Sequence, residues 1–180
     1  ILSVGRFEPS LNVKRHDILI NAFRAFTHSP VSKNWSLILV GGSADDAWLA
    51  KLKNMAKGLS IEFVPNATHT RLVELYAGAS IYWHAAGYQV DQETSPALTE
   101  HFGISIVEAI SMRAVPFIVP CGGAPEIACD PSFHWNSVDE LVAKTIAHIK
   151  NPTVLNATLK QIKVNEFTKQ EFARKLALLL

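Results

Sequence analysis

Two acidic residues, Glu100 and Glu108, border a segment that could bind phosphate and sugar groups. Gly103 is expected to open a helix, which places Glu100 just before the first turn and Glu108 inside the helix. Backbone amides at a helix start have no intrahelical acceptor and carry partial positive charge, so they favour an anion. Carboxylates accept hydrogen bonds from hydroxyls. This combination suits a ligand that carries both phosphate and sugar, such as a sugar nucleotide.

Glu108 has two interpretations, because it interrupts an apolar run from Ile106 to Ile110. It either faces outward as an ordinary helix residue or lies half-buried to hold a ligand. The helical period alone favours the outward orientation, since glutamates are mostly exposed.

A second group of candidates, Gly5, Arg6 and Lys14, follows the first apolar run of the chain. Gly5 lets the backbone turn, and Lys14 lies where the next helix is expected to start. A cation is unfavourable at a helix N-terminus unless it serves an anion, because that end already carries partial positive charge. Arg6 and Lys14 are therefore candidate diphosphate ligands. Two solvated surface cations are the alternative from local sequence.

Apolar runs typical of strands alternate with helix-like segments along the chain. Strands are expected over residues 1–4, 35–40, 61–64, 80–83 and 114–119. Helices are expected over residues 14–26, 47–59, 68–77, 105–112 and 138–149. This alternation predicts an α/β fold, a doubly wound parallel sheet with helices on both faces, because each parallel connection needs a crossover. Ligands of such a sheet bind beyond the carboxyl ends of the strands, where the candidate residues are expected to gather.

The length of 180 residues fits one domain with a tail. We expect a ligand-binding, Rossmann-like domain over residues 1–150 and a C-terminal helical tail over residues 151–180. The end of this tail is too apolar to stay exposed, so it should pack on another domain or back on this one. The chain starts without methionine inside a strand-like run, which indicates a fragment of a longer protein.

Composition argues against several classes of partner. Seventeen Lys and Arg against sixteen Asp and Glu leave a net charge of +1, too small to indicate nucleic acid or an anionic membrane as the main partner. Cys121 and Cys129 lack the spacing of a metal site. No apolar run approaches the roughly 18–20 residues of a membrane span, so we expect a soluble, cytoplasmic protein.

The same residues resemble a large family, the retaining GT-B glycosyltransferases with an E-x7-E motif, also called glycosyl transferase group 1. That family includes bacterial and dolichol-pathway mannosyltransferases. Five elements stand in the order of the family's C-terminal, donor-binding domain and cover roughly the first 150 residues; these are Ser3 to Phe7, Lys14, Leu39 to Gly42, Glu100 to Ile104, and Val115-Pro116 through Ile127. Five elements in order make chance agreement improbable.

The resemblance implies a role for each candidate. Arg6 and Lys14 would bind the donor diphosphate and stabilise the charge of the leaving group, Glu108 would hold the ribose, and Glu100 would hold the transferred sugar. Arg6, Lys14 and Glu100 would be the catalytic residues. The remaining contacts to the donor would come from Gly5, Val64, Leu72, Phe102, Gly103, Ile104 and Ser105. The base would lie against residues 64–66.

The resemblance also implies which partners the protein has. The donor would be GDP-mannose or a UDP-sugar, with no tightly bound cofactor and no metal. The acceptor site would lie in a missing N-terminal domain, so the fragment alone would be inactive. Any membrane association would come through that missing half or a lipid-linked acceptor.

The sequence departs from the family pattern at two places. Residues 8–13 lengthen the loop before Lys14, so Arg15 could be the second phosphate cation instead. The segment 85–99 is also longer than common. His84, after the fourth strand, could act as a general base, but a lone histidine there is more often structural, and His101 is interpreted in the same way.

Other nucleotide-binding classes lack their sequence motifs. The dinucleotide motif G-x-G-x-x-G is absent after the first strand, and Gly41-Gly42-Ser43 lacks its third glycine. No phosphate-binding G-x-x-x-x-G-K-[ST] motif occurs. The serious alternative is a non-catalytic nucleotide-binding module.

Overall fold

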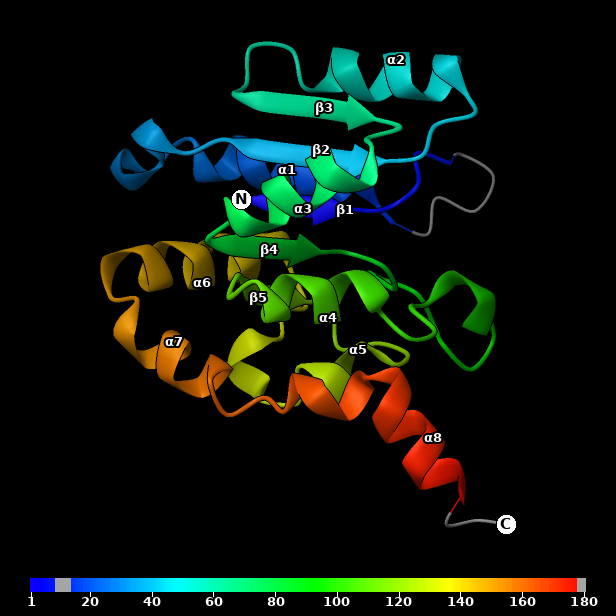
Figure 1. The fold of residues 1–180 in the computed structure, drawn as a ribbon. Coiled ribbons are helices and arrows are strands. Elements are labelled where there is room, and N and C mark those ends of the chain that lie inside the picture. The colour runs from blue at the N-terminus through cyan, green and yellow to red at the C-terminus, as the bar shows by residue number, and fades with distance from the viewer. Residues whose placement is uncertain (9–13, 178–180) are drawn as a thin grey trace.

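The computed structural model describes residues 1–8 and 14–177 and contains a five-stranded parallel sheet with helices on both faces (Figure 1). The strands are β1 (Leu2–Val4), β2 (Leu37–Gly41), β3 (Ile61–Pro65), β4 (Ile81–His84) and β5 (Val115–Ile118). They follow the order β3-β2-β1-β4-β5, and every neighbouring pair is parallel. The predicted fold class is confirmed.

Eight α-helices lie in the described part of the chain. They are α1 (His16–Phe26), α2 (Asp46–Met55), α3 (His69–Ala77), α4 (Ile104–Ser111), α5 (Ala124–Ile127), α6 (Val138–Lys150), α7 (Thr153–Leu159) and α8 (Lys169–Ala177). Four short 3-10 segments, η1 (Pro30–Asn34), η2 (Pro96–Leu98), η3 (Pro131–Phe133) and η4 (Val164–Phe167), lie in the connections. In Figure 1, α3 and α4 lie in front of the sheet, and α1 lies behind it.

Helix α2 is shorter than the sequence pattern predicts. The apolar spacing extends to residue 59, but the helix ends at Met55. Gly58 adopts a left-handed φ of 80°, a conformation that terminates helices and that glycine adopts without strain. The prediction of a helix over residues 47–59 was therefore wrong at its C-terminal end.

The core buries the strands β4 and β5 completely. All four residues of β4 and all four of β5 are buried. Trp83 on β4 packs against the rings of Phe23 and Phe26 of α1, with 6.4 Å between ring centroids in each case. Its indole nitrogen also donates to Thr145 Oγ1 of α6 at 3.1 Å. The end of β4 is thereby held firmly against the helices behind the sheet.

The sheet has its topological switch point between β1 and β4. The chain passes from β1 to β2 on one side, whereas β4 pairs with the other side of β1. In open parallel sheets a crevice forms at the carboxyl ends of the strands where the order reverses in this way. The loops after β1 and β4 are thus the ones that meet at this crevice.

The described part of the C-terminal tail packs back on the sheet and its helices. Helix α7 contacts α6 and β5, η4 contacts α4, and Leu159 is buried. Helix α8 contacts η4 and extends away from the sheet (Figure 1). Part of the apolar tail end, residues 178–180, and most of the lengthened loop, residues 9–13, lie outside the described residues. The domain boundary at residue 150 stays a prediction.

Among residues 1–8 and 14–177, no helix combines the length and apolar character needed to span a membrane.

Candidate functional site

The switch point brings together a cation and an acid from distant parts of the chain. Lys14 Nζ lies 2.5 Å from Glu100 Oε2, and His84 Nε2 lies 2.9 Å from the same oxygen. Lys14 follows β1, His84 ends β4, and Glu100 precedes α4. The three side chains form one hydrogen-bonded group at the crevice, which we call the Lys14–Glu100–His84 group.

Glu100 is ionised in this group. Burial alone would raise the pKa of its carboxyl group, but the hydrogen bonds and charges of His84 and Lys14 together lower that pKa to about 2. Burial lowers the pKa of His84, although Glu100 opposes this effect. We infer that His84 is neutral at pH 7 and that its Nε2 carries the proton, because a carboxylate only accepts hydrogen bonds.

Glycines make the close approach of Lys14 possible. A Cβ at Gly5 would lie 2.6 Å from Lys14 Cγ, so the stem of Lys14 occupies the space that a side chain at position 5 would need. A Cβ at Gly41 would lie 1.8 Å from Gly5 O, so the ends of β1 and β2 also touch through glycine. Gly5 thus acts in the site through its lack of a side chain.

Arg6, which follows Gly5 after β1, is exposed and lines a hollow. Its side chain is 81% exposed and pairs with Glu8 at 3.7 Å. The hollow has a volume of about 520 Å³ and lies between the loops that follow β1, β2 and β3; it is lined by Arg6, Phe7, Glu8, Gly42, Ser43, Ala44, Asp45 and Asn66. An exposed guanidinium at such a place is available to an anion.

Arg15, the alternative to Lys14, is engaged elsewhere. Its guanidinium pairs with Asp17 at 3.2 Å and donates to Tyr88 O at 2.9 Å. It also lies 5.7 Å from the centre of the Tyr88 ring. Lys14, and not Arg15, is therefore the cation that contacts Glu100 in the crevice.

The backbone around Glu100 is held by the glycines that precede α5. A Cβ at Gly122 would lie 2.2 Å from Glu100 O, and a Cβ at Gly123 would lie 2.4 Å from His101 O. Gly123 N donates to Glu100 O at 2.7 Å. These glycines lie in one of the segments that resemble the glycosyltransferase family, and close backbone packing against Glu100 gives a physical reason for them.

Helix α4 begins at the crevice as predicted. Gly103 is its N-cap and has a φ of 92°, a value that strains other residues. Ile104 and Ser105 form the first turn, where amides lack intrahelical acceptors. The side chains of Phe102 and Ile104 are exposed, and the Phe102 ring packs edge-on against Phe167, with centroids 6.0 Å apart. This helix start is accessible to an anionic ligand.

Glu108 is exposed on α4, the orientation that the helical period favours. Its Oε2 nevertheless accepts a hydrogen bond from the hydroxyl of buried Tyr76 on α3 at 2.8 Å. Burial raises the pKa of Tyr76, so the tyrosine remains a protonated donor. Glu108 is thus outward-facing and still fixed at one oxygen.

Val64 and Leu72 are both half-buried and do not line the hollow at Arg6. Val64 lies on β3, and Leu72 lies on α3. Asn66, which follows β3, does line the hollow, and its Oδ1 accepts from Ser43 N at 3.0 Å. The loop proposed to hold the base therefore reaches the hollow through Asn66.

Two residues that hydrogen-bond to the candidate acids, His84 and Tyr76, were not among the predicted site residues. His84 was interpreted as structural, although its position directly after a strand at the switch point was a signal for the site. Tyr76 carried no such signal, because a tyrosine on the apolar face of a helix is typical of a core position. His101, by contrast, is exposed.

Within the described ranges, no group of three or more His, Cys, Asp or Glu side chains is arranged to hold a metal ion.

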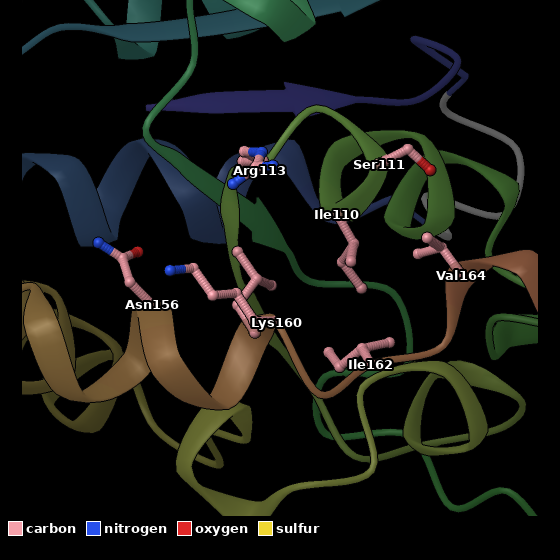
Figure 2. A pocket seen from close by; sticks show the side chains of 8 residues that line it. Ile110, Ser111, Arg113, Asn156, Lys160, Ile162 and Val164 are labelled. Atoms are coloured by element: carbon pink, nitrogen blue, oxygen red, sulfur yellow. The ribbon is translucent and has the colours of Figure 1, made fainter.

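A second hollow lies between the C-terminal end of α4 and residues 156–164 (Figure 2). Its volume is about 450 Å³, and it is lined by Ile110, Ser111, Arg113, Asn156, Leu159, Lys160, Ile162 and Val164. In Figure 2, Arg113 and Lys160 lie on one side of it, and Ile162 and Val164 lie on the other. The hollow lies at the C-terminal end of α4, whereas Glu100 precedes the N-terminal end of this helix. The charged side chains of the hollow, Arg113 and Lys160, are exposed. Arg113 is therefore a useful control for Arg6.

Comparisons with known proteins found one relative by sequence. A mannosyltransferase of Dictyostelium discoideum, GDP-Man:Man(3)GlcNAc(2)-PP-Dol alpha-1,2-mannosyltransferase, is 28% identical over 138 residues. The match covers 70% of this chain and 25% of that protein, so the chain spans about a quarter of the relative's length.

Solved structures share the fold. The catalytic domain of cholesterol-alpha-glucosyltransferase from Helicobacter pylori superposes with a TM-score of 0.65 and 24% identity, covering 96% of this chain and 97% of that one. TarM gives a TM-score of 0.69 at 13% identity, covering 98% and 34%. Trehalose-6-phosphate synthase OtsA gives a TM-score of 0.70 at 10% identity, covering 91% of this chain and 38% of that one.

The family described as glycosyl transferases group 1 matches residues 1–174. The chain belongs to this glycosyltransferase family, and its fold is that of a GT-B half.

Proposed function

We propose that this chain is the donor-binding domain of a retaining, mannosyltransferase-like glycosyltransferase and binds a nucleoside diphosphate sugar at the crevice between β1 and β4. The observation that carries the proposal is the contact between Lys14 and Glu100, 2.5 Å apart, at the topological switch point and beside the start of α4. A cation, a carboxylate and a helix N-terminus at one place match the phosphate and the hydroxyls of such a donor.

The proposed roles follow from the charge of each group. Arg6 and Lys14 bind the diphosphate and stabilise the negative charge that develops on it as the glycosidic bond breaks. The amides of the first turn of α4 add further hydrogen-bond donors. Glu100 accepts hydrogen bonds from hydroxyls of the transferred sugar, and Glu108 accepts them from the ribose.

Partners outside this chain complete the reaction. Membership of the family implies a nucleotide-sugar donor and an acceptor. We propose that the acceptor binds to an N-terminal domain of the full-length protein, because this chain spans a quarter of its Dictyostelium relative. The name of that relative includes GDP-Man, which favours GDP-mannose over a UDP-sugar as the donor. We also propose that the acceptor is lipid-linked and that the protein is located in the cytoplasm.

The donor can be identified by thermal unfolding of the purified chain with a panel of UDP, GDP, ADP and their sugars. A ligand that binds only the folded state stabilises it, by about 2.7 kcal/mol at one hundred times its Kd. We expect one base to raise the unfolding temperature more than the others, and its sugar conjugate to raise it further. If no nucleotide changes the unfolding temperature, the chain does not bind a donor and the proposal is wrong.

A non-catalytic nucleotide-binding module is the alternative, favoured by the small share of the Dictyostelium relative that this chain spans. Nucleotide binding alone does not separate the two functions. Transfer of sugar by the full-length parent, with the anomeric configuration of the product determined by NMR, would do so. We expect transfer with retention by the parent and no transfer by this chain alone. A parent that binds the donor but transfers nothing would favour the module.

A further inference from the structure

A row of three buried aromatic side chains connects the two acids of the site. Tyr76, Tyr82 and His84 are 3%, 0% and 2% exposed. The ring centroids of Tyr76 and Tyr82 lie 6.3 Å apart, and those of Tyr82 and His84 lie 6.5 Å apart with an interplanar angle of 26°. Tyr76 comes from α3, and the other two come from β4. The row therefore runs from the helix to the end of the strand.

Each end of the row holds one acid through one oxygen. Tyr76 donates to Glu108 Oε2 at 2.8 Å, and His84 donates to Glu100 Oε2 at 2.9 Å. Lys14 also binds Oε2 of Glu100. Within residues 1–8 and 14–177, Oε1 of either acid has no hydrogen-bond partner. Each carboxylate is thus held at Oε2, and its Oε1 can accept a hydrogen bond from a ligand.

The middle of the row is tied to the sheet. The Tyr82 hydroxyl donates to Val4 O at 3.2 Å and accepts from Val4 N at 3.4 Å. Val4 ends β1, directly before Gly5 and Arg6. The row therefore has a fixed position relative to the strand that carries the proposed phosphate ligands.

We propose that His84 and Tyr76 are positioning residues, which hold Oε2 of Glu100 and of Glu108 so that Oε1 of each acid is presented to the donor. The inference rests on the proposed function, because it assigns Glu100 to the sugar and Glu108 to the ribose. Fixing a carboxylate before binding lowers the conformational entropy that the complex loses, and so raises affinity.

A merely structural role predicts a different pattern of effects. Tyr76 and His84 would then lower stability when replaced, but nucleotide and sugar binding would change together or not at all. Positioning instead predicts a split, in which each replacement affects the part of the donor that its acid contacts. The Nδ1 atom of His84 is buried without a hydrogen-bond partner among the described residues, so the side chain makes one polar contact, the one to Glu100.

The test uses titration calorimetry of the whole chain with a nucleoside diphosphate and with its sugar conjugate. A hydrogen bond contributes about 0.5–1.5 kcal/mol, which corresponds to a change of about two- to twelvefold in affinity. Tyr76→Phe should weaken both ligands by this factor. His84→Leu should weaken only the sugar conjugate, and His84→Gln, whose side-chain amide can donate to Glu100, should restore much of that affinity. Tyr88→Phe is the matched control, since Tyr88 is buried on the segment after β4 and does not contact either acid.

The outcomes separate this inference from the proposed function. If the wild-type chain binds neither ligand, the proposed function is wrong and the positioning roles fall with it. If the wild type binds both, and Tyr76→Phe and His84→Leu bind them as Tyr88→Phe does, only the positioning roles are wrong. Nitrogen-15 NMR of the wild-type chain gives a check that needs no folded variant. We expect the proton of His84 on Nε2, and a neutral ring with the proton on Nδ1 would overturn the role of His84.

Discussion

Lys14 Nζ lies 2.5 Å from Glu100 Oε2, although the two residues are 86 positions apart in the sequence. They meet because β1 and β4 are neighbours in the sheet and both strands end at the same edge. In the proposed site, Lys14 binds the diphosphate and Glu100 accepts hydrogen bonds from the sugar. Their ion pair therefore links the two halves of the donor site.

Lys14→Met should reduce both stability and nucleotide affinity. It leaves the Glu100 carboxylate, whose side chain is only 12% exposed, with His84 as its remaining partner. Breaking a buried pair costs about 3–5 kcal/mol, and we expect about 1–3 kcal/mol here because Lys14 is partly exposed. Urea unfolding and calorimetry measure the two effects. Lys33→Met, at an exposed lysine of η1, should change neither, and equal effects of both variants would contradict the pairing.

Arg6→Ala should weaken nucleoside diphosphate binding by tenfold or more while leaving stability unchanged. A charge-assisted hydrogen bond is worth about 1.5–3 kcal/mol, whereas an exposed ion pair such as that of Arg6 and Glu8 stabilises the fold very little. Calorimetry and thermal unfolding together test this. Arg113→Ala removes an exposed arginine at the far hollow and should leave affinity intact. Unchanged affinity in Arg6→Ala would remove Arg6 from the site.

Periodicity and turn residues were sufficient to predict the fold. The strands of the sheet are short apolar runs, and Gly103 marks the start of α4 where it was expected. The error in α2 arose because its apolar spacing continues past Met55, while the left-handed conformation of Gly58 ends the helix. A hydrophobic pattern reports which face is buried, but it does not report the backbone angles that end an element.

The candidate site was only partly predictable for a different reason. Arg6, Lys14 and Glu100 were predicted as candidates because they lie near helix starts and strand ends, where parallel sheets bind ligands. His84 and Tyr76 are linked to the candidate site by hydrogen bonds to Glu100 and Glu108, which lie 16 and 32 positions away in the sequence. Such contacts depend on how α3, β4 and α4 pack, which local spacing does not contain.

Stability should fall as the pH is lowered from about 6.5 to 4, partly because of His16. Burial lowers the pKa of His16 to about 4. The folded chain therefore keeps His16 neutral while the unfolded chain takes up a proton below pH 6.5, so its stabilising contribution is complete above pH 6.5 and is lost on acidification. The loss amounts to about 3 kcal/mol, and His84 acts in the same direction.

Denaturant unfolding at several pH values between 7 and 4 measures this effect. His16→Gln does not titrate and should flatten the dependence of the unfolding free energy on pH. The exposed His28 provides the control, since His28→Gln should leave the slope as in the wild type. A wild-type slope in His16→Gln would show that His16 is not the group responsible.

Gly123→Ala should destabilise the fold and weaken sugar-nucleotide binding. The new Cβ would lie 2.4 Å from His101 O, while the φ of −78° suits alanine, so the effect is steric. Such overpacking costs about 1–3 kcal/mol and would displace the backbone beside Glu100. In Gly78→Ala the nearest atom, Glu74 O, is 3.5 Å away, and we expect a change within about 0.5 kcal/mol. Thermal unfolding that ranks the two variants equally would contradict the steric argument.

The most direct test is a pair of calorimetric titrations, nucleoside diphosphate with and without its sugar, on Glu100→Gln and Glu108→Gln. Glu108 is proposed to hold the ribose, which both ligands contain, so Glu108→Gln should weaken both alike. Glu100 is proposed to meet only the sugar, so Glu100→Gln should spare the bare nucleotide and weaken the sugar conjugate. In the full-length enzyme it should also lower transfer, because contacts that tighten toward the transition state are lost. If Glu100→Gln weakens the bare nucleotide as much as Glu108→Gln does, the division of the site into sugar and ribose halves is wrong.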